Sequence, residues 1–205
     1  MNGHEIDTPL GPARVHVTDS AGAGTLVLGH GAGGGGEATD LQAVTAAAAE
    51  AGWRVLRVEQ PWRVAGRRIA PAPARLDLGW SAVLERVRAD GLLTGPLVLG
   101  GRSAGARVAC RSAAERGADG VLALAFPLHP PGRPEKSRAD ELSAVAVPIV
   151  VVQGERDTFG EPAEVAAVLS GRPGASVYAV PGDHGLTKNL DIVAAAAVSW
   201  LVELH

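Results

Sequence analysis

Short apolar runs alternate along the chain with longer segments in which apolar residues recur every three or four positions. The short runs are typical of buried strands, and the longer segments are typical of helices with one buried face. Predicted strands cover 14–18, 25–28, 54–59, 97–100, 121–126, 147–152 and 176–180, and predicted helices cover 41–51, 76–90, 104–116, 161–169 and 189–204. Apolar strands separated by helices pair in a parallel sheet that is covered on both faces, so we predict an α/β fold with a mostly parallel central sheet.

Local signals support several of these boundaries. Gly52 directly follows the helix predicted over 41–51, and glycine is a common helix stop. Pro162 lies in the first turn of the helix predicted over 161–169, where proline is well tolerated. The first strand, 14–18, is expected at an edge of the sheet.

A serine flanked by glycines lies where the strand predicted over 97–100 meets the following helix. The sequence there is Gly101-Arg102-Ser103-Ala104-Gly105, which matches the nucleophile elbow, a sharp strand-to-helix turn. Such a turn forces the serine into a strained backbone conformation, and a side chain at either flanking glycine would collide with neighbouring elements. The motif therefore predicts an exposed Ser103 hydroxyl at the positive end of a helix.

Two later strand ends carry the partners that a nucleophilic serine needs. The strand predicted over 147–152 is followed by Asp157, and the strand predicted over 176–180 is followed by His184. A serine nucleophile requires a base and a carboxylate that orients the base, here in the chain order serine, acid, histidine. Ser103, His184 and Asp157 are thus predicted as nucleophile, base and orienting acid. Asp183 and Glu155 are the weaker alternatives for the acid.

A glycine-rich loop after the strand predicted over 25–28 supplies a further part of such a site. Acyl transfer places negative charge on the carbonyl oxygen, and backbone N–H groups must be in place to stabilise it. The N–H groups of Ala32 in this loop and of Ala104 after the serine are the predicted donors. His30 in the same loop is expected to hold the loop in place.

The glycine loop also fits a different kind of site. Residues 29–34 satisfy the G-x-G-x-x-G fingerprint of dinucleotide-binding folds, and Glu59 ends the next strand, where an acid that binds ribose would lie. This alternative gives Ser103, Asp157 and His184 no role. The two hypotheses therefore remain to be separated by the arrangement of these residues in the fold.

Composition and charge narrow the function classes. With 205 residues, the chain is expected to form one domain, 1–205. A net charge of −3 favours neither nucleic acid nor a membrane surface, and no signal peptide is visible. The one cysteine, Cys110, is expected to be a small buried packing residue. A cytoplasmic location fits these features, and the sequence leaves the oligomeric state open.

Two segments without periodicity, 60–75 and 127–141, follow strands and are expected to form the pocket walls at the carboxyl edge of the sheet. Neither is long enough for a lid domain, so the site should be shallow and open. Arginines cluster in both segments, either to hold a carboxylate or phosphate on the substrate or as solvated surface charge. The possible pocket residues are His30, Trp62, Arg102 and His129, with core packing as the alternative for Trp62 and loop packing as the alternative for His129.

The motifs together resemble the small, lidless α/β-hydrolases of the dienelactone-hydrolase-like kind. The matching segments are 30–34, 101–105, 126–132, 153–157 and 183–184. The Pro-Leu-His-Pro-Pro sequence within 126–132 resembles most closely a branch that includes a subunit of the nonspecific-lethal histone acetyltransferase complex. The resemblance implies an α/β-hydrolase fold and a Ser-His-Asp site on Ser103, His184 and Asp157. Dienelactone hydrolases use cysteine as nucleophile, so Ser103 points to a different substrate.

The expected function is that of a serine hydrolase which cleaves a small carboxylic ester or thioester through an acyl-serine intermediate. This chemistry requires neither a cofactor nor a metal, and the expected partner is a small acyl substrate. The alternative is a binding or scaffold protein that keeps the hydrolase geometry without turnover, as some relatives in the resembled branch do.

Overall fold

A computed structural model describes residues 3–20 and 22–204 and contains one eight-stranded sheet. The strands lie in the order β1-β2-β4-β3-β5-β6-β7-β8. β1 and β2 pair antiparallel, as do β2 and β4, and all other neighbours are parallel. The bounds are β1 (His4–Ile6), β2 (Ala13–Thr18), β3 (Gly24–Gly29), β4 (Trp53–Glu59), β5 (Leu97–Arg102), β6 (Gly120–Leu124), β7 (Ile149–Gly154) and β8 (Ala175–Val180). The prediction of an α/β fold with a mostly parallel sheet is confirmed.

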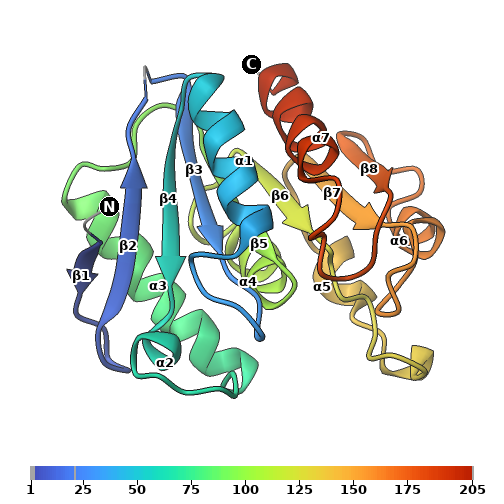
Figure 1. Ribbon diagram of the computed structural model, residues 1–205, viewed down its shortest axis with the longest axis horizontal. Coiled ribbons are helices and arrows are strands. Elements are labelled where there is room, and N and C mark those ends of the chain that lie inside the picture. The colour runs from blue at the N-terminus through green and yellow to red at the C-terminus, as the bar shows by residue number, and fades with distance from the viewer. Residues whose placement is uncertain (1–2, 21, 205) are drawn as a thin grey trace.

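Helices cover both faces of this sheet (Figure 1). One face is covered by α1 (Thr39–Glu50) and α7 (Leu190–Glu203), which pack side by side. The other face carries α3 (Pro73–Ala89), α4 (Ala104–Ser112), α5 (Ala139–Ser143) and α6 (Pro162–Val168). Two short elements, α2 (Pro61–Val64) and the 3₁₀ helix η1 (Pro134–Lys136), lie in the connections after β4 and β6.

The central strands alternate their side chains between two hydrophobic cores. In β3, Leu26 and Leu28 pack under α1 and α7, whereas Val27 packs against the opposite helices. In β7, Val150 and Val151 are both fully buried and point to opposite faces. Burial on both sides explains why these strands are apolar at every position rather than at every second one.

The beginning of the sheet differs from the sequence prediction. β2 is an interior strand between β1 and β4, because the three residues of β1 pair with it and form the edge. The interval predicted to be irregular after β4 contains α2, and α3 begins at Pro73 rather than at residue 76. In both helices a proline occupies the first turn, where its missing N–H costs no helical hydrogen bond.

Two elements around the predicted site are shorter than expected. α4 ends at Ser112, four residues before the predicted end at Arg116, and a turn with Gly117 at φ 64° follows. β6 ends at Leu124, because Ala125 adopts φ 46° and turns the chain out of the strand. Cys110 on α4 is buried as expected, and burial raises the pKa of its thiol to about 12. Within the described residues, no helix combines the length and apolar character needed to cross a membrane.

Candidate active site

The elbow at Ser103 connects β5 to α4. Ser103 has φ 54° and ψ −109°, a backbone conformation that L residues rarely adopt. A Cβ atom at Gly101 or at Gly105 would overlap the carbonyl oxygen of Gly29 in β3. The sequence prediction that side chains at the two flanking glycines would collide with neighbouring elements is confirmed. This close approach of three elements places the Ser103 hydroxyl at the carboxyl edge of the sheet.

The loops after β7 and β8 bring an acid and an imidazole to this hydroxyl. His184 Nδ1 donates to Asp157, at 2.8 Å from Oδ2 and 3.0 Å from Oδ1. With its hydrogen on Nδ1, the ring offers Nε2 as acceptor, and the Ser103 hydroxyl lies 2.9 Å from it. Asp157 is buried, whereas His184 and Ser103 are partly exposed. The structure thus brings the three residues into one continuous hydrogen-bonded chain.

Two residues that sequence reasoning missed hold Asp157 from its other sides. The side chain of Gln153, the fifth residue of β7, donates from Nε2 to Asp157 Oδ2 at 2.9 Å. The backbone N–H of Phe159 donates to Asp157 Oδ1 at 2.9 Å. The Phe159 ring also stacks on the His184 imidazole, with ring centroids 4.1 Å apart and planes inclined by 29°. Phe159 therefore restrains both the acid and the base.

The alternative acids are placed differently. Asp183 Oδ1 accepts the backbone N–H of Gly185 at 3.0 Å, in a local turn. Glu155 is exposed on the loop after β7. Neither carboxylate has a hydrogen bond to His184 within the described part of the chain.

The glycine loop and the elbow border the same cavity, which measures about 350 Å³ and is open to solvent. Ala32 and Ala104 both line it, together with Ser103 and His184. Ala104 is the first residue of α4, so its N–H has no acceptor within the helix. No inserted lid domain covers the cavity among residues 3–20 and 22–204. An acyl carbonyl placed in this cavity would lie beside the Ser103 hydroxyl, between Ala32 and Ala104.

Arg102 is the one residue of the four possible pocket residues that lines this cavity. Its Nε lies 3.2 Å from a carboxylate oxygen of Asp40, which is buried in the first turn of α1. Burial raises the pKa of Asp40, and the nearby Arg102 guanidinium opposes this increase. The guanidinium also packs against Gly31 and Gly34, so Arg102 braces the glycine loop.

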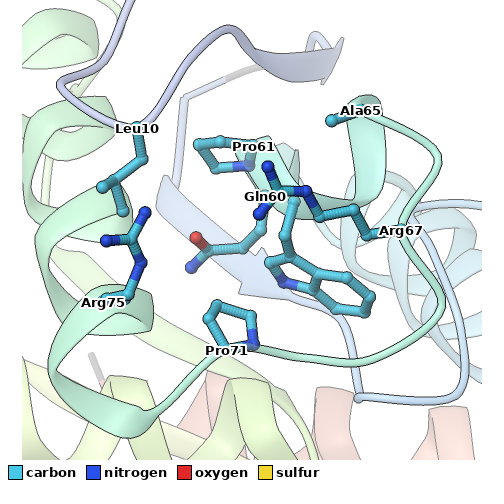
Figure 2. A pocket seen from close by; sticks show the side chains of 8 residues that line it. Leu10, Gln60, Pro61, Ala65, Arg67, Pro71 and Arg75 are labelled. Carbon is cyan, nitrogen blue, oxygen red and sulfur yellow. The ribbon is translucent and has the colours of Figure 1, made fainter.

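His30 and Trp62 lie outside the cavity that contains Ser103. His30 Nδ1 donates to the Gly31 carbonyl at 2.9 Å, and its Nε2 accepts the Gln60 N–H at 3.1 Å. These contacts select one neutral tautomer, and burial lowers the pKa of His30. Trp62 packs against the His30 ring and lines a separate cavity of about 30 Å³. Figure 2 shows this second cavity, which Gln60 and Pro61 also border. His30 and Trp62 both support the glycine loop from outside the cavity that contains Ser103.

His129 is also outside this cavity. Its ring nitrogens lie 3.1 Å from the Pro130 carbonyl oxygen and 3.2 Å from Glu164 Oε1. The backbone N–H of His129 donates to the Phe159 carbonyl at 2.9 Å. The residue therefore joins the loop after β6 to the loop after β7 and to α6, so the structure shows the loop-packing alternative and corrects the pocket-lining one.

The arrangement of the glycine loop does not fit the dinucleotide alternative. Glu59, the acid proposed to bind ribose, forms an ion pair with Arg14 at 3.2 Å. The Arg102 side chain occupies the space against Gly31 and Gly34 that a pyrophosphate would need. Within the described residues, no group of three or more His, Cys, Asp or Glu side chains has an arrangement that could hold a metal ion.

Two arginines that line the cavity beside Arg102 also escaped a specific prediction. Arg107 lies one turn after Ser103 on α4, and its N–H donates to the Ser103 carbonyl at 3.1 Å. Arg138 lies in the connection after β6, and the sequence did not distinguish it from the other basic residues of that segment. The spacing of four residues from the serine on a predicted helix was the signal that could have identified Arg107.

Comparisons with known proteins agree with this fold. The family described as alpha/beta hydrolase domain matches residues 22–193. No curated protein matches the chain in sequence. An alpha-beta serine hydrolase homologue from Coxiella burnetii is 18% identical, with a TM-score of 0.80 and coverage of 97% of this chain and 96% of that chain.

Two further solved structures are similar to nearly the whole chain. A serine hydrolase without a lid from Xanthomonas campestris is 22% identical, with a TM-score of 0.80 and coverage of 98% of this chain and 94% of that one. Est1E from Butyrivibrio proteoclasticus, solved with ferulic acid bound, is 17% identical, with a TM-score of 0.81 and coverage of 98% of both chains. At these identities the likeness concerns the fold.

Proposed function

This chain belongs to the alpha/beta hydrolase domain family, and from that premise we propose that it is a serine hydrolase of small carboxylic esters or thioesters. One observation carries the proposal: the Ser103 hydroxyl lies 2.9 Å from His184 Nε2, while Nδ1 of the same ring is held by Asp157. This chain of hydrogen bonds activates a hydroxyl as a nucleophile in acyl transfer.

In the acylation step, Ser103 Oγ forms a bond to the substrate carbonyl carbon, and its proton moves to His184 Nε2. The carbonyl oxygen becomes an oxyanion, which the N–H groups of Ala32 and Ala104 stabilise. Asp157 keeps the Nδ1 hydrogen in place and stabilises the imidazolium. Collapse of the intermediate breaks the bond to the leaving group, which takes the proton from Nε2 and departs as an alcohol or a thiol.

In the deacylation step, water enters the open cavity and gives a proton to His184 Nε2 while its oxygen attacks the acyl carbon. The second tetrahedral intermediate expels Ser103 Oγ, which recovers the proton from the imidazolium. The products are a carboxylic acid and the original enzyme. Atoms and charges balance without a cofactor or a further reactant.

The cavity sets the size of the substrate. A volume of about 350 Å³, open to water and without a lid, fits a small acyl compound and gives no long groove for a peptide. We therefore place small-molecule esters and thioesters before peptides as substrates.

Replacement of the nucleophile tests the proposal. Ser103→Ala is expected to abolish labelling by a fluorophosphonate probe and hydrolysis of 4-nitrophenyl hexanoate, because the probe and the ester need the same hydroxyl. The matched control is Ser143→Ala, since Ser143 is an exposed serine at the end of α5. Circular dichroism checks that both variants are folded. Equal labelling of the wild type and Ser103→Ala would refute the assignment.

The same experiment separates the enzyme from a scaffold protein. A scaffold of the kind suggested by the resemblance of segment 126–132 to the nonspecific-lethal complex branch predicts folded wild-type protein without labelling or turnover. The hydrogen-bonded Ser103, His184 and Asp157 support the enzyme, because binding alone gives no reason to align these three groups. The branch-level resemblance and a cytoplasmic location remain part of the proposal.

A further inference from the structure

The cavity beside Ser103 is bordered by three guanidinium groups, those of Arg102, Arg107 and Arg138. Two of them are neutralised by nearby carboxylates. Arg102 pairs with Asp40 at 3.2 Å. Arg107 donates to both oxygens of Glu141, at 2.8 Å and 2.5 Å. These two arginines therefore contribute shape to the cavity wall and little net charge.

Arg138 is different. Within the described residues it forms no ion pair, and Glu141 on its own segment pairs with Arg107 and Arg111 instead. Its Nη1 donates to the Pro127 carbonyl at 2.7 Å, and its backbone N–H donates to the Leu128 carbonyl at 2.7 Å. The half-buried guanidinium is thus held by the loop after β6 while its remaining N–H groups lack a carboxylate.

This arrangement leaves one positive charge without an acidic partner at the wall of the cavity. Burial lowers the pKa of Arg138 and the neighbouring Arg107 adds repulsion, while the charge of Glu141 opposes this decrease, and the guanidinium stays charged at neutral pH. A neutral substrate that fills the cavity would remove water from this charge and give nothing in return. A substrate with a carboxylate would replace that water with charge-assisted hydrogen bonds.

We propose that Arg138 is a specificity-determining residue that binds a carboxylate group of the substrate in the cavity beside Ser103. The inference rests on the proposed function and adds the substrate class: esters or thioesters that carry a second, anionic carboxylate away from the bond that is cleaved. Because the charges of Arg102 and Arg107 are balanced by Asp40 and Glu141, the net positive charge at the cavity wall comes from Arg138.

The experiment compares charged with neutral esters of similar shape. Mono-4-nitrophenyl adipate carries a carboxylate on its acyl half, and its neutral partner is 4-nitrophenyl hexanoate. 4-Acetoxybenzoate carries a carboxylate on its alcohol half, and its neutral partner is the methyl ester. In wild-type protein, kcat/KM for one charged ester should exceed that for its neutral partner by about tenfold, a typical gain from charge-assisted hydrogen bonds to a guanidinium. The pair that shows the preference identifies which half of the substrate faces Arg138.

Variants assign the preference to one residue. Arg138→Gln should reduce the ratio of charged to neutral ester to near that of the uncatalysed reaction, and Arg138→Lys should retain part of it because the charge remains. The control is Arg133→Gln, an exposed arginine on the same segment that does not line the cavity. Added sodium chloride should weaken the preference in wild-type protein, since salt screens a partly exposed charge.

A binding measurement tests the site without turnover. Ser103→Ala protein should bind adipate in isothermal titration calorimetry, and the additional change Arg138→Gln should remove that binding while Arg133→Gln retains it. If the wild type is not labelled by the fluorophosphonate but adipate binding depends on Arg138, the proposed hydrolase is refuted and the anion site is supported. If the wild type is labelled and hydrolyses neutral esters, but the ratio of charged-ester to neutral-ester kcat/KM is the same in wild type and Arg138→Gln, the anion site is refuted and the hydrolase is supported.

Discussion

At the scale of single residues, the immobilised carboxylate of Asp157 governs the geometry of the site. Its side chain is buried and accepts hydrogen bonds from His184, Gln153 and the N–H of Phe159. A buried carboxylate is costly unless donors surround it, so each of these contacts supports its position. Because only one of the donors takes part in proton transfer, the other two have a positioning role.

Gln153 is the donor whose removal should separate position from chemistry. Its Nε2 also lies 2.8 Å from the Gly160 carbonyl and 3.2 Å from the Phe126 carbonyl, while its Oε1 has no hydrogen-bond partner in the described chain. Gln153→Leu should therefore lower kcat for 4-nitrophenyl hexanoate by about 10- to 100-fold, because a small displacement of the acid misaligns the base. KM should change less than kcat.

A spectroscopic measurement distinguishes positioning from general destabilisation. The proton on His184 Nδ1 reports its hydrogen bond to Asp157, so its downfield NMR resonance should shift or broaden in Gln153→Leu. Val151→Ala is the control, since Val151 is buried in the same strand but has its side chain in the core. An unchanged resonance and unchanged kcat in Gln153→Leu would contradict the positioning role.

The sequence predicted Ser103, His184 and Asp157 as one site because the proposed chemistry demands these residue types at successive strand ends in one order. It could not identify Gln153 or Phe159 in the same way. A glutamine at the end of an apolar strand and a phenylalanine in a loop have no chemical signature, and their roles depend on contacts between separate loops. The same limitation hid Arg138, whose neighbours in the sequence are equally basic but are exposed.

At the scale of elements, the contact between α4 and β3 determines whether the elbow can form. Gly105 lies in the first turn of α4 directly against the backbone of Gly29. Alanine normally stabilises a helix relative to glycine by about 1 kcal/mol. Here the added methyl group would overlap backbone atoms of β3, which pairs with β4 and β5 and cannot move alone.

Gly105→Ala should therefore destabilise the protein by about 1–3 kcal/mol, the usual range for overpacking, in spite of its better helix propensity. Urea unfolding followed by circular dichroism measures this change. Gly33→Ala is the matched control, because a Cβ at Gly33 has no neighbour within 4 Å. A Gly105→Ala variant as stable as the wild type would show that α4 and β3 separate easily.

The sequence pattern predicted the boundaries of several elements incorrectly. β1 contains three residues, too few for an alternating pattern, and so β2 was wrongly placed at the edge of the sheet. The start of α3 at Pro73 follows the same rule that correctly placed Pro162 in the first turn of α6, but the apolar periodicity of α3 begins only at Leu76. The early end of β6 depends on the backbone conformation of Ala125, which alanine does not signal.

At the scale of the whole molecule, one sheet separates two hydrophobic cores. Apolar strands and intervening helices were sufficient to predict the parallel sheet and its two covered faces. The pattern did not reveal that α1 and α7 share one face while α3 to α6 share the other, since helices on both faces bury apolar residues against the sheet. That assignment depends on the strand order, because the chain places β4 on one side of β3 and then β5 on the other side.

Because both cores are built from the same strands, we expect residues 1–205 to unfold as one domain. Val150 and Val151 are adjacent, fully buried and directed to opposite cores. Val150→Ala and Val151→Ala should each lower the free energy of unfolding by about 2 kcal/mol, the scale of burying a valine side chain, and each should shift the entire transition. Tryptophan fluorescence reports both layers through Trp53 and Trp80, and it should coincide with far-ultraviolet circular dichroism in both variants. If either substitution split the transition into two steps, the layers would be separate cooperative units, and the site at their shared edge could lose its geometry before the sheet unfolds.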